Sequence, residues 1–187
     1  MKTYLLLITL LLLQPLAAVA EVTFKASLAN QRVISALPRV LFQGGNQVVT
    51  VFQARNNSEF AALTLHLTSQ KGWDRRWQGV FVPSESTVYL KSLPLEKPLL
   101  LHEVGHCVWC YHLTNEQKEE YNTLWTIENS GSCLPSQYSY TSEEEGFAEA
   151  FRIYFGGKEW PGEVVSSLQK NYFKRLASGQ TGKVTSL

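Results

Sequence analysis

Two histidines and a glutamate have the spacing of a catalytic zinc site. The segment from His102 to His106 matches the His-Glu-x-x-His pattern, with Glu103 as its acidic residue. Residues four apart lie on one face of an α-helix, so both imidazoles can reach one metal ion. The glutamate can then take a proton from a water whose pKa zinc lowers to about 7. The pattern therefore predicts zinc ligands at His102 and His106 and a general base at Glu103.

The flanking residues predict that this motif lies on a helix from about Lys97 to Tyr111. Pro98 suits the first turn of a helix, where a missing N–H costs little. The helical period places the apolar residues on the side opposite the histidines: Leu101, Val104, Val108 and Tyr111. One face is therefore expected to pack against the core while the other carries the ligands. A buried histidine often only completes a hydrogen-bond network, but two histidines and a glutamate on one polar face favour the metal.

A catalytic zinc site needs a third protein ligand and an open position. Glu145 and Glu149 are the candidates, because they lie four residues apart on one face of a helix predicted over residues 142–155. One carboxylate can bind the metal while the other holds a ligand imidazole in place. In a second interpretation these residues only favour a helix N-terminus, since Ser142 and Glu145 have capping-box spacing. Spacing alone leaves both interpretations open.

Residues 102–106 and 145–151 together resemble the catalytic domain of the anthrax lethal-factor-like zinc peptidases. This gluzincin group includes secreted Pro-Pro endopeptidases, and it pairs a His-Glu-x-x-His helix with a later Glu-x-Phe-Ala-Glu-x-Phe helix. The resemblance implies zinc as the single metal of the chain, Glu103 as the base and Glu149 as the partner of a ligand imidazole. It also implies three zinc ligands: His102, His106 and Glu145.

The same resemblance implies a tyrosine at the site. The family has one seven residues before the third ligand, where it donates a hydrogen bond to the tetrahedral intermediate, and Tyr138 stands there in this chain. Tyr140 is the alternative, and either could simply be a packed loop residue. Gly146 departs from the family motif, which commonly has an aromatic residue there. We expect this glycine to let its helix approach the helix that bears Gly105.

The remaining chain predicts an α+β fold, in which a small mixed β-sheet packs on the motif helix and further helices follow. The resemblance implies that this fold is zincin-like. An exposed edge strand among residues 78–92 is expected to pair with an extended substrate. His66 would lie on a strand and point to solvent or across the sheet. The predicted elements are a helix over 27–42 interrupted by Pro38, strands over 47–53, 61–68, 77–82 and 86–93, and helices over 114–128, 142–155 and 160–177.

Residues 1–20 have the composition of a secretory signal. A short charged start, an apolar run and the small residues Ala18-Val19-Ala20 follow in order, and the run is too short to span a bilayer as a helix. Cleavage after Ala20 would leave residues 21–187 as one metallopeptidase domain. We therefore expect an extracytoplasmic protein, secreted or periplasmic, without stable membrane association after cleavage. An uncleaved anchor is the alternative.

Three cysteines would enter an oxidising compartment with such a signal. Cys107 and Cys110 are three residues apart on the motif helix, so we expect one of them to form a disulfide with Cys133. The competing interpretation makes the cysteines ligands of a structural zinc ion, together with His106 or His112.

The charges exclude some partners. Lys and Arg number 17 against 16 Asp and Glu, so nothing indicates a nucleic-acid partner.

Together, the motif, the resemblance and the signal segment predict a secreted zinc endopeptidase that acts on a peptide or protein. Two other functions stay open: a catalytically silent binding module on the same scaffold, and a structural zinc protein.

Overall fold

The structure is a computed structural model that describes residues 22–43, 47–68, 78–91, 96–156 and 162–180. The expected signal segment, residues 1–20, lies outside these ranges. Within them, none of the helices has the length and apolar character needed to cross a bilayer.

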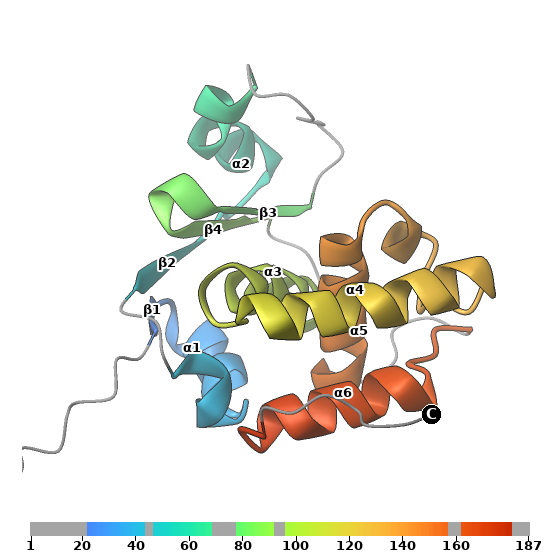
Figure 1. Cartoon of the computed structure of the whole chain (residues 1–187). Helices are drawn as coiled ribbons and strands as arrows, with labels where there is room; N and C mark the ends of the chain where they lie inside the picture. Colours follow the sequence, from blue (N-terminus) through green and yellow to red (C-terminus); the bar gives the residue numbers. More distant parts are fainter. Residues whose placement is uncertain (1–21, 44–46, 69–77, 92–95, 157–161, 181–187) are drawn as a thin grey trace, which may run out of the picture.

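A small mixed sheet forms one part of the molecule (Figure 1). Its strands lie in the order β1-β2-β4-β3, so β1 and β3 are the edges. β1 pairs with β2 and β2 with β4 in parallel, whereas β3 runs antiparallel to β4. The strand bounds are β1 Thr23–Lys25, β2 Val48–Gln53, β3 Gly79–Val82 and β4 Thr87–Leu90. The predicted α+β class with a small mixed sheet is confirmed, and β1 is an additional strand that its short length concealed.

In the described ranges six α-helices accompany the sheet, and the motif helix α3 lies between the sheet and the C-terminal helices (Figure 1). α3 contacts β3 and β4 on one side and α5 on another. The helix bounds are α1 Leu28–Ser35, α2 Asn57–Leu63, α3 Glu96–Tyr111, α4 Asn115–Ser130, α5 Glu143–Gly156 and α6 Ser167–Ala177. Short 3-10 turns are η1 Arg39–Phe42, η2 Leu65–Leu67, η3 Pro83–Glu85 and η4 Tyr138–Tyr140. The predicted helices over 97–111, 114–128 and 142–155 are thus confirmed.

The strand predicted over residues 61–68 is wrong, because this stretch is helical. The Asn56 side chain accepts a hydrogen bond from the Glu59 amide and so caps the start of α2. Phe60 and Leu67 are buried, which gives this region one apolar helical face instead of an alternating strand. His66 consequently lies on η2, where its Nε2 atom is 2.7 Å from Glu85 Oε1.

The last helix begins later than the predicted residue 160. α6 starts at Ser167, because the Ser166 hydroxyl accepts a hydrogen bond from the Gln169 amide at 3.0 Å and caps the helix. Residues 162–165 precede the cap in a non-helical conformation, whereas 160–161 lie outside the described ranges.

The core fixes the two helices that carry the motifs. Val104 and Val108 of α3 are completely buried, as predicted for the apolar face of this helix. Phe147 and Phe151 of α5 are also completely buried, and both rings contact Phe173 of α6. Each such ring contributes about 1.5–3 kcal/mol by leaving water. Neither α3 nor α5 can therefore rotate without exposing core side chains.

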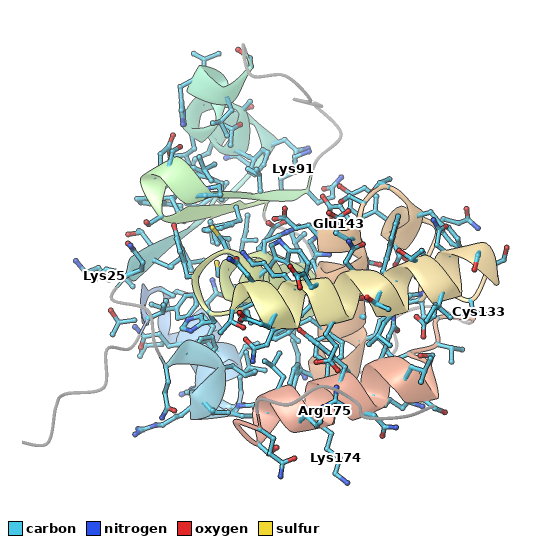
Figure 2. All side chains as sticks on the ribbon, in the orientation of Figure 1. Lys25, Lys91, Cys133, Glu143, Lys174 and Arg175 are labelled. Atoms are coloured by element: carbon cyan, nitrogen blue, oxygen red, sulfur yellow. The ribbon has the colours of Figure 1, made fainter. Side chains whose placement is uncertain are left out.

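The predicted disulfide is absent, since all three cysteines are free. Cys110 lies near the start of α4, and Cys133, labelled in Figure 2, follows its far end. A helix of 16 residues is about 24 Å long, whereas a disulfide requires Cα atoms within about 7 Å. Burial also raises the pKa of the Cys107 thiol, which disfavours the thiolate that a structural zinc site needs.

Candidate metal centre

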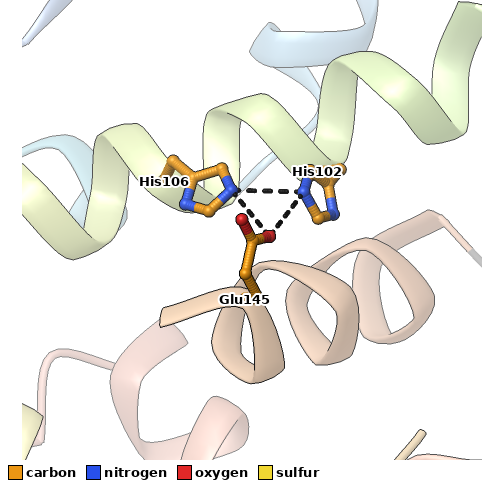
Figure 3. A group of neighbouring side chains, drawn as sticks. All are labelled: His102, His106 and Glu145. Carbon is orange, nitrogen blue, oxygen red and sulfur yellow. Dashed lines mark hydrogen bonds and ion pairs between the residues drawn. The ribbon is translucent and has the colours of Figure 1, made fainter. Parts of the chain in front are cut away.

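The crossing of α3 and α5 brings the two sequence motifs together. A Cβ atom on Gly105 would lie 2.9 Å from the Ala148 Cα atom, which is closer than side chains normally approach. The glycine therefore lets the two backbones pack closely. This contact faces the side chains of His102 and His106 toward Glu145 on α5 (Figure 3).

Three potential ligand atoms meet at this crossing. Glu145 Oε2 lies 3.2 Å from His102 Nε2 and 3.2 Å from His106 Nε2. The two Nε2 atoms are 3.1 Å apart (Figure 3). Among the described residues this is the only group of three or more His, Cys, Asp or Glu side chains with ligand atoms close enough to hold a metal. In that part of the chain, therefore, the cysteines form no metal group with His106 or His112.

The other nitrogen of each imidazole contacts a carboxylate. His102 Nδ1 lies 2.9 Å from Glu149 Oε1, and His106 Nδ1 lies 3.1 Å from Glu144 Oε1. An ionised carboxylate only accepts hydrogen bonds, so each Nδ1 carries a proton. In the neutral ring this leaves the Nε2 lone pair pointing at Glu145, which is the arrangement of metal-ligating histidines.

The donor set fits a zinc ion. Glu145 Oε2 is buried and has no hydrogen-bond partner among the described residues. When both rings are neutral, three acceptors converge without a donor and repel one another, and either a proton or a metal cation between them removes the conflict. Two imidazole nitrogens and one carboxylate oxygen are the ligands of a catalytic zinc site that keeps an open position. Glu145 also follows the helix cap, since its amide donates to Ser142 Oγ, so it serves both interpretations of its spacing.

Protons compete with a metal for these nitrogens. Burial lowers the pKa of His102, but its contacts with the Glu145 and Glu149 carboxylates outweigh burial and raise this pKa to about 8. Burial likewise lowers the pKa of His106, whereas Glu144 and Glu145 raise it to about 10. Burial raises the pKa of Glu145, and the two histidines hold it well below its usual range. The pocket thus stabilises positive charge of either kind.

Glu103 lies between the metal group and the edge strand β3. Its side chain is buried, and burial raises its pKa, although the nearby histidines and a hydrogen bond with the Phe81 backbone act in the opposite direction. A Cβ atom on Gly79 would lie 2.7 Å from Glu103 Oε1. The glycine therefore leaves room for this carboxylate beside the strand.

Tyr138, and not Tyr140, faces the metal group. The Tyr138 hydroxyl donates to Glu145 Oε1 at 3.2 Å, and its ring centroid lies 5.8 Å from that of His102. Burial and the Glu145 charge raise the pKa of Tyr138, so the phenol keeps its proton. The Tyr140 hydroxyl instead accepts from the Leu134 amide in the preceding loop.

The expected role of Gly146 is wrong. A Cβ atom there would lie 2.5 Å from Trp125 Cδ1 of α4, so this glycine makes room for the indole and not for α3. Trp125 Nε1 donates to the Ser139 carbonyl at 2.8 Å and thereby holds η4, the turn that bears Tyr138. The close contact with α3 occurs two residues later, at Ala148.

Sequence reasoning missed several residues around the ligands. Glu144 stands beside Glu145 in the first turn of α5, and a search for one imidazole partner per histidine would have found it. Arg152 is three residues after Glu149, a helical spacing that indicates a pair. Trp125 and Glu163 carry no such signal, because their positions depend on how α4 and the segment before α6 pack.

Comparison of this chain with protein-family models, curated proteins and solved structures found no match.

Proposed function

We propose that this protein is a zinc-dependent endopeptidase with a zincin-like fold. The convergence of His102, His106 and Glu145, with Glu103 beside them, carries the proposal. A structural zinc site has four protein ligands, whereas this group offers three, which is the number in a catalytic site. The segment 1–20 supports export from the cell, and the substrate would be an extended peptide or a protein.

Glu103 would act as the general base and then as the general acid. Zinc, when bound, supplies a Lewis acid that polarises a carbonyl group and lowers the pKa of water. Glu103 accepts a proton from the attacking water and delivers it to the nitrogen of the leaving amine. The upward pKa shift that burial causes suits this role, because the protonated form must be accessible near neutral pH.

Tyr138 would donate a hydrogen bond to the oxygen that becomes negative in the transition state. Its raised pKa keeps the donor proton in place. In the structure the Tyr138 hydroxyl donates to Glu145 Oε1, 3.2 Å away. During the reaction it would donate to the substrate oxygen in place of Glu145 Oε1.

The edge strand β3 would bind the substrate backbone. In the part of the chain that is described, β3 pairs only with β4, which leaves its outer edge for strand addition. Gly79, at one end of β3, lies against Glu103. A peptide added along β3 would therefore pass the general base.

Two measurements on residues 21–187 test the proposal. We expect about one zinc ion per chain in the wild type and a lower zinc content in Glu145→Ala. A library of internally quenched peptides is expected to be cleaved by the wild type and not by Glu103→Gln, which should keep its zinc. Absence of zinc from the wild type would refute the proposal. Zinc without cleavage of any peptide would instead favour the catalytically silent binding module.

A further inference from the structure

A buried row of charged side chains leads from His102 to the segment before α6. Glu149 Oε1 contacts His102 Nδ1 at 2.9 Å and accepts a hydrogen bond from Arg152 Nε at 3.0 Å. A second guanidinium nitrogen of Arg152 donates to Glu149 Oε2 at 3.0 Å and to Glu163 Oε1 at 2.5 Å. The row therefore joins α3, α5 and residue 163 through consecutive hydrogen bonds.

The geometry of this row fixes the orientation of the Glu149 carboxylate. Arg152 holds both carboxylate oxygens, one with Nε and one with Nη2, and this two-point contact prevents the carboxylate from turning. Glu163 in turn holds the guanidinium from the other side, at Nη1 and Nη2. A fixed Oε1 determines where the His102 Nδ1 proton points, and so where the opposite nitrogen, Nε2, presents its lone pair.

Stability alone does not account for these charges. The side chains of Arg152 and Glu163 are each 6% exposed and that of Glu149 is 10% exposed, so all three lose most of their water. Buried ion pairs of this kind are often replaced by apolar residues without loss of stability, because desolvation offsets the attraction.

We propose that Arg152 and Glu163 are positioning residues of the metal site, which act on zinc through Glu149 and His102. Arg152 fixes the plane of the Glu149 carboxylate, and Glu163 shares the guanidinium charge so that Glu149 keeps its strength as an acceptor. This inference rests on the proposed zinc site of His102, His106 and Glu145. Under this inference, Glu163 in the segment before α6 contributes to the zinc affinity of the site although it is not a ligand.

Zinc affinity, measured by competition with a chromophoric chelator, tests this inference without a peptide substrate. Arg152→Lys keeps the charge but loses the two-pronged contact, and Glu163→Gln keeps the shape but loses the charge. Changing a partner of a ligand typically costs about 10- to 100-fold in metal affinity. We expect about a tenfold loss for Arg152→Lys and a smaller loss of several-fold for Glu163→Gln.

A second ion pair provides the matched controls. Arg175, labelled in Figure 2, lies on α6 and pairs with Glu120 of α4, partly buried and outside the row described above. Arg175→Lys and Glu120→Gln should leave zinc affinity unchanged. The visible spectrum of the cobalt(II)-loaded protein adds a structural readout, because it reports the ligand arrangement at the metal. It should change in Arg152→Lys and stay the same in Arg175→Lys.

The outcomes separate this inference from the proposed function. A wild type that binds zinc, with Arg152→Lys and Glu163→Gln binding it as tightly, would overturn the positioning role and leave the zinc site intact. A wild type that binds no zinc would overturn both. If Arg152→Lys does not fold, Glu163→Gln decides the question: weakened zinc binding in a folded protein supports the role, and unchanged binding overturns it.

Discussion

Gly105→Ala should weaken zinc binding although residue 105 touches no ligand atom. The added Cβ would lie 2.9 Å from the Ala148 Cα atom, whereas carbon atoms pack at about 3.5–4.0 Å. Backbone atoms have no rotamer that could relieve this contact, so the backbones of α3 and α5 must separate by about 0.6–1.1 Å. The separation disturbs the core side chains that pack the two helices. Overpacking of this kind costs about 1–3 kcal/mol, and the better helix propensity of alanine returns about 1 kcal/mol.

The separation acts directly on the ligand atoms. Glu145 is on α5, and its Oε2 atom lies 3.2 Å from each histidine Nε2 on α3. Metal sites tolerate deviations of only about 0.2 Å in ligand distance, so a shift several times larger should cost at least about tenfold in zinc affinity.

Chelator competition measures the loss of zinc affinity, and thermal unfolding of the metal-free protein measures the loss of stability. Gly131→Ala is the control, because a Cβ there meets Cys133 Sγ at an ordinary 3.5 Å and lies at the far end of α4. We expect lower zinc affinity and lower stability in Gly105→Ala, and neither in Gly131→Ala. Zinc binding by Gly105→Ala at wild-type strength would refute the argument that the close approach of the helices sets the ligand distances.

Three further predictions concern the ligands and the residues beside them. Glu103→Gln should retain zinc but lose about 10²- to 10⁴-fold in kcat on any peptide that the wild type cleaves, and full activity would remove Glu103 from the mechanism. Tyr138→Phe should lower kcat by about 10²-fold with little change in zinc affinity, because it removes a donor to the transition state; a change in KM alone would contradict this role. The metal-free protein should lose stability as pH rises from 6.5 through 8 toward 10. Folding raises the pKa of His102 to about 8 and that of His106 to about 10, above the unfolded value of 6.5. Their contribution to stability is therefore complete below pH 6.5 and is lost as pH rises through the folded pKa values. Zinc should reverse this trend, because the metal binds the deprotonated rings. The test is to measure unfolding midpoints across this pH range, once with zinc and once with a chelator. Parallel curves would show that the histidines do not bind the metal.

Local patterns were sufficient to predict much of the candidate site. The helical period alone places His102 and His106 on one face of α3, and Leu101, Val104 and Val108 opposite them are buried as their spacing indicates. The capping box at Thr114 and Gln117 also forms as the sequence predicts, because both partners lie within four residues. Such predictions succeed because they depend on contacts within one helical turn.

Competing local signals explain the errors in the fold. The alternating leucines of residues 61–68 fit a strand, but Asn56 caps α2 just before them. Phe60 of α2 and Leu67 of the following turn η2 are the buried residues of this stretch. The expected bridge to Cys133 failed for a different reason: the rigid length of α4 separates Cys110 from Cys133, and the prediction did not take into account the helix between them.

The sequence by itself determined which residue types could bind zinc and that the two histidines share a helical face. Only the tertiary structure decided that Glu145 reaches them, because the approach of α3 to α5 depends on Gly105 packing against Ala148. It also directed the Tyr138 hydroxyl at Glu145 and the Tyr140 hydroxyl at the Leu134 amide, and it brought Glu163 into contact with Arg152. Contacts between residues distant in the chain depend on how whole helices pack, and packing is a property of the complete core.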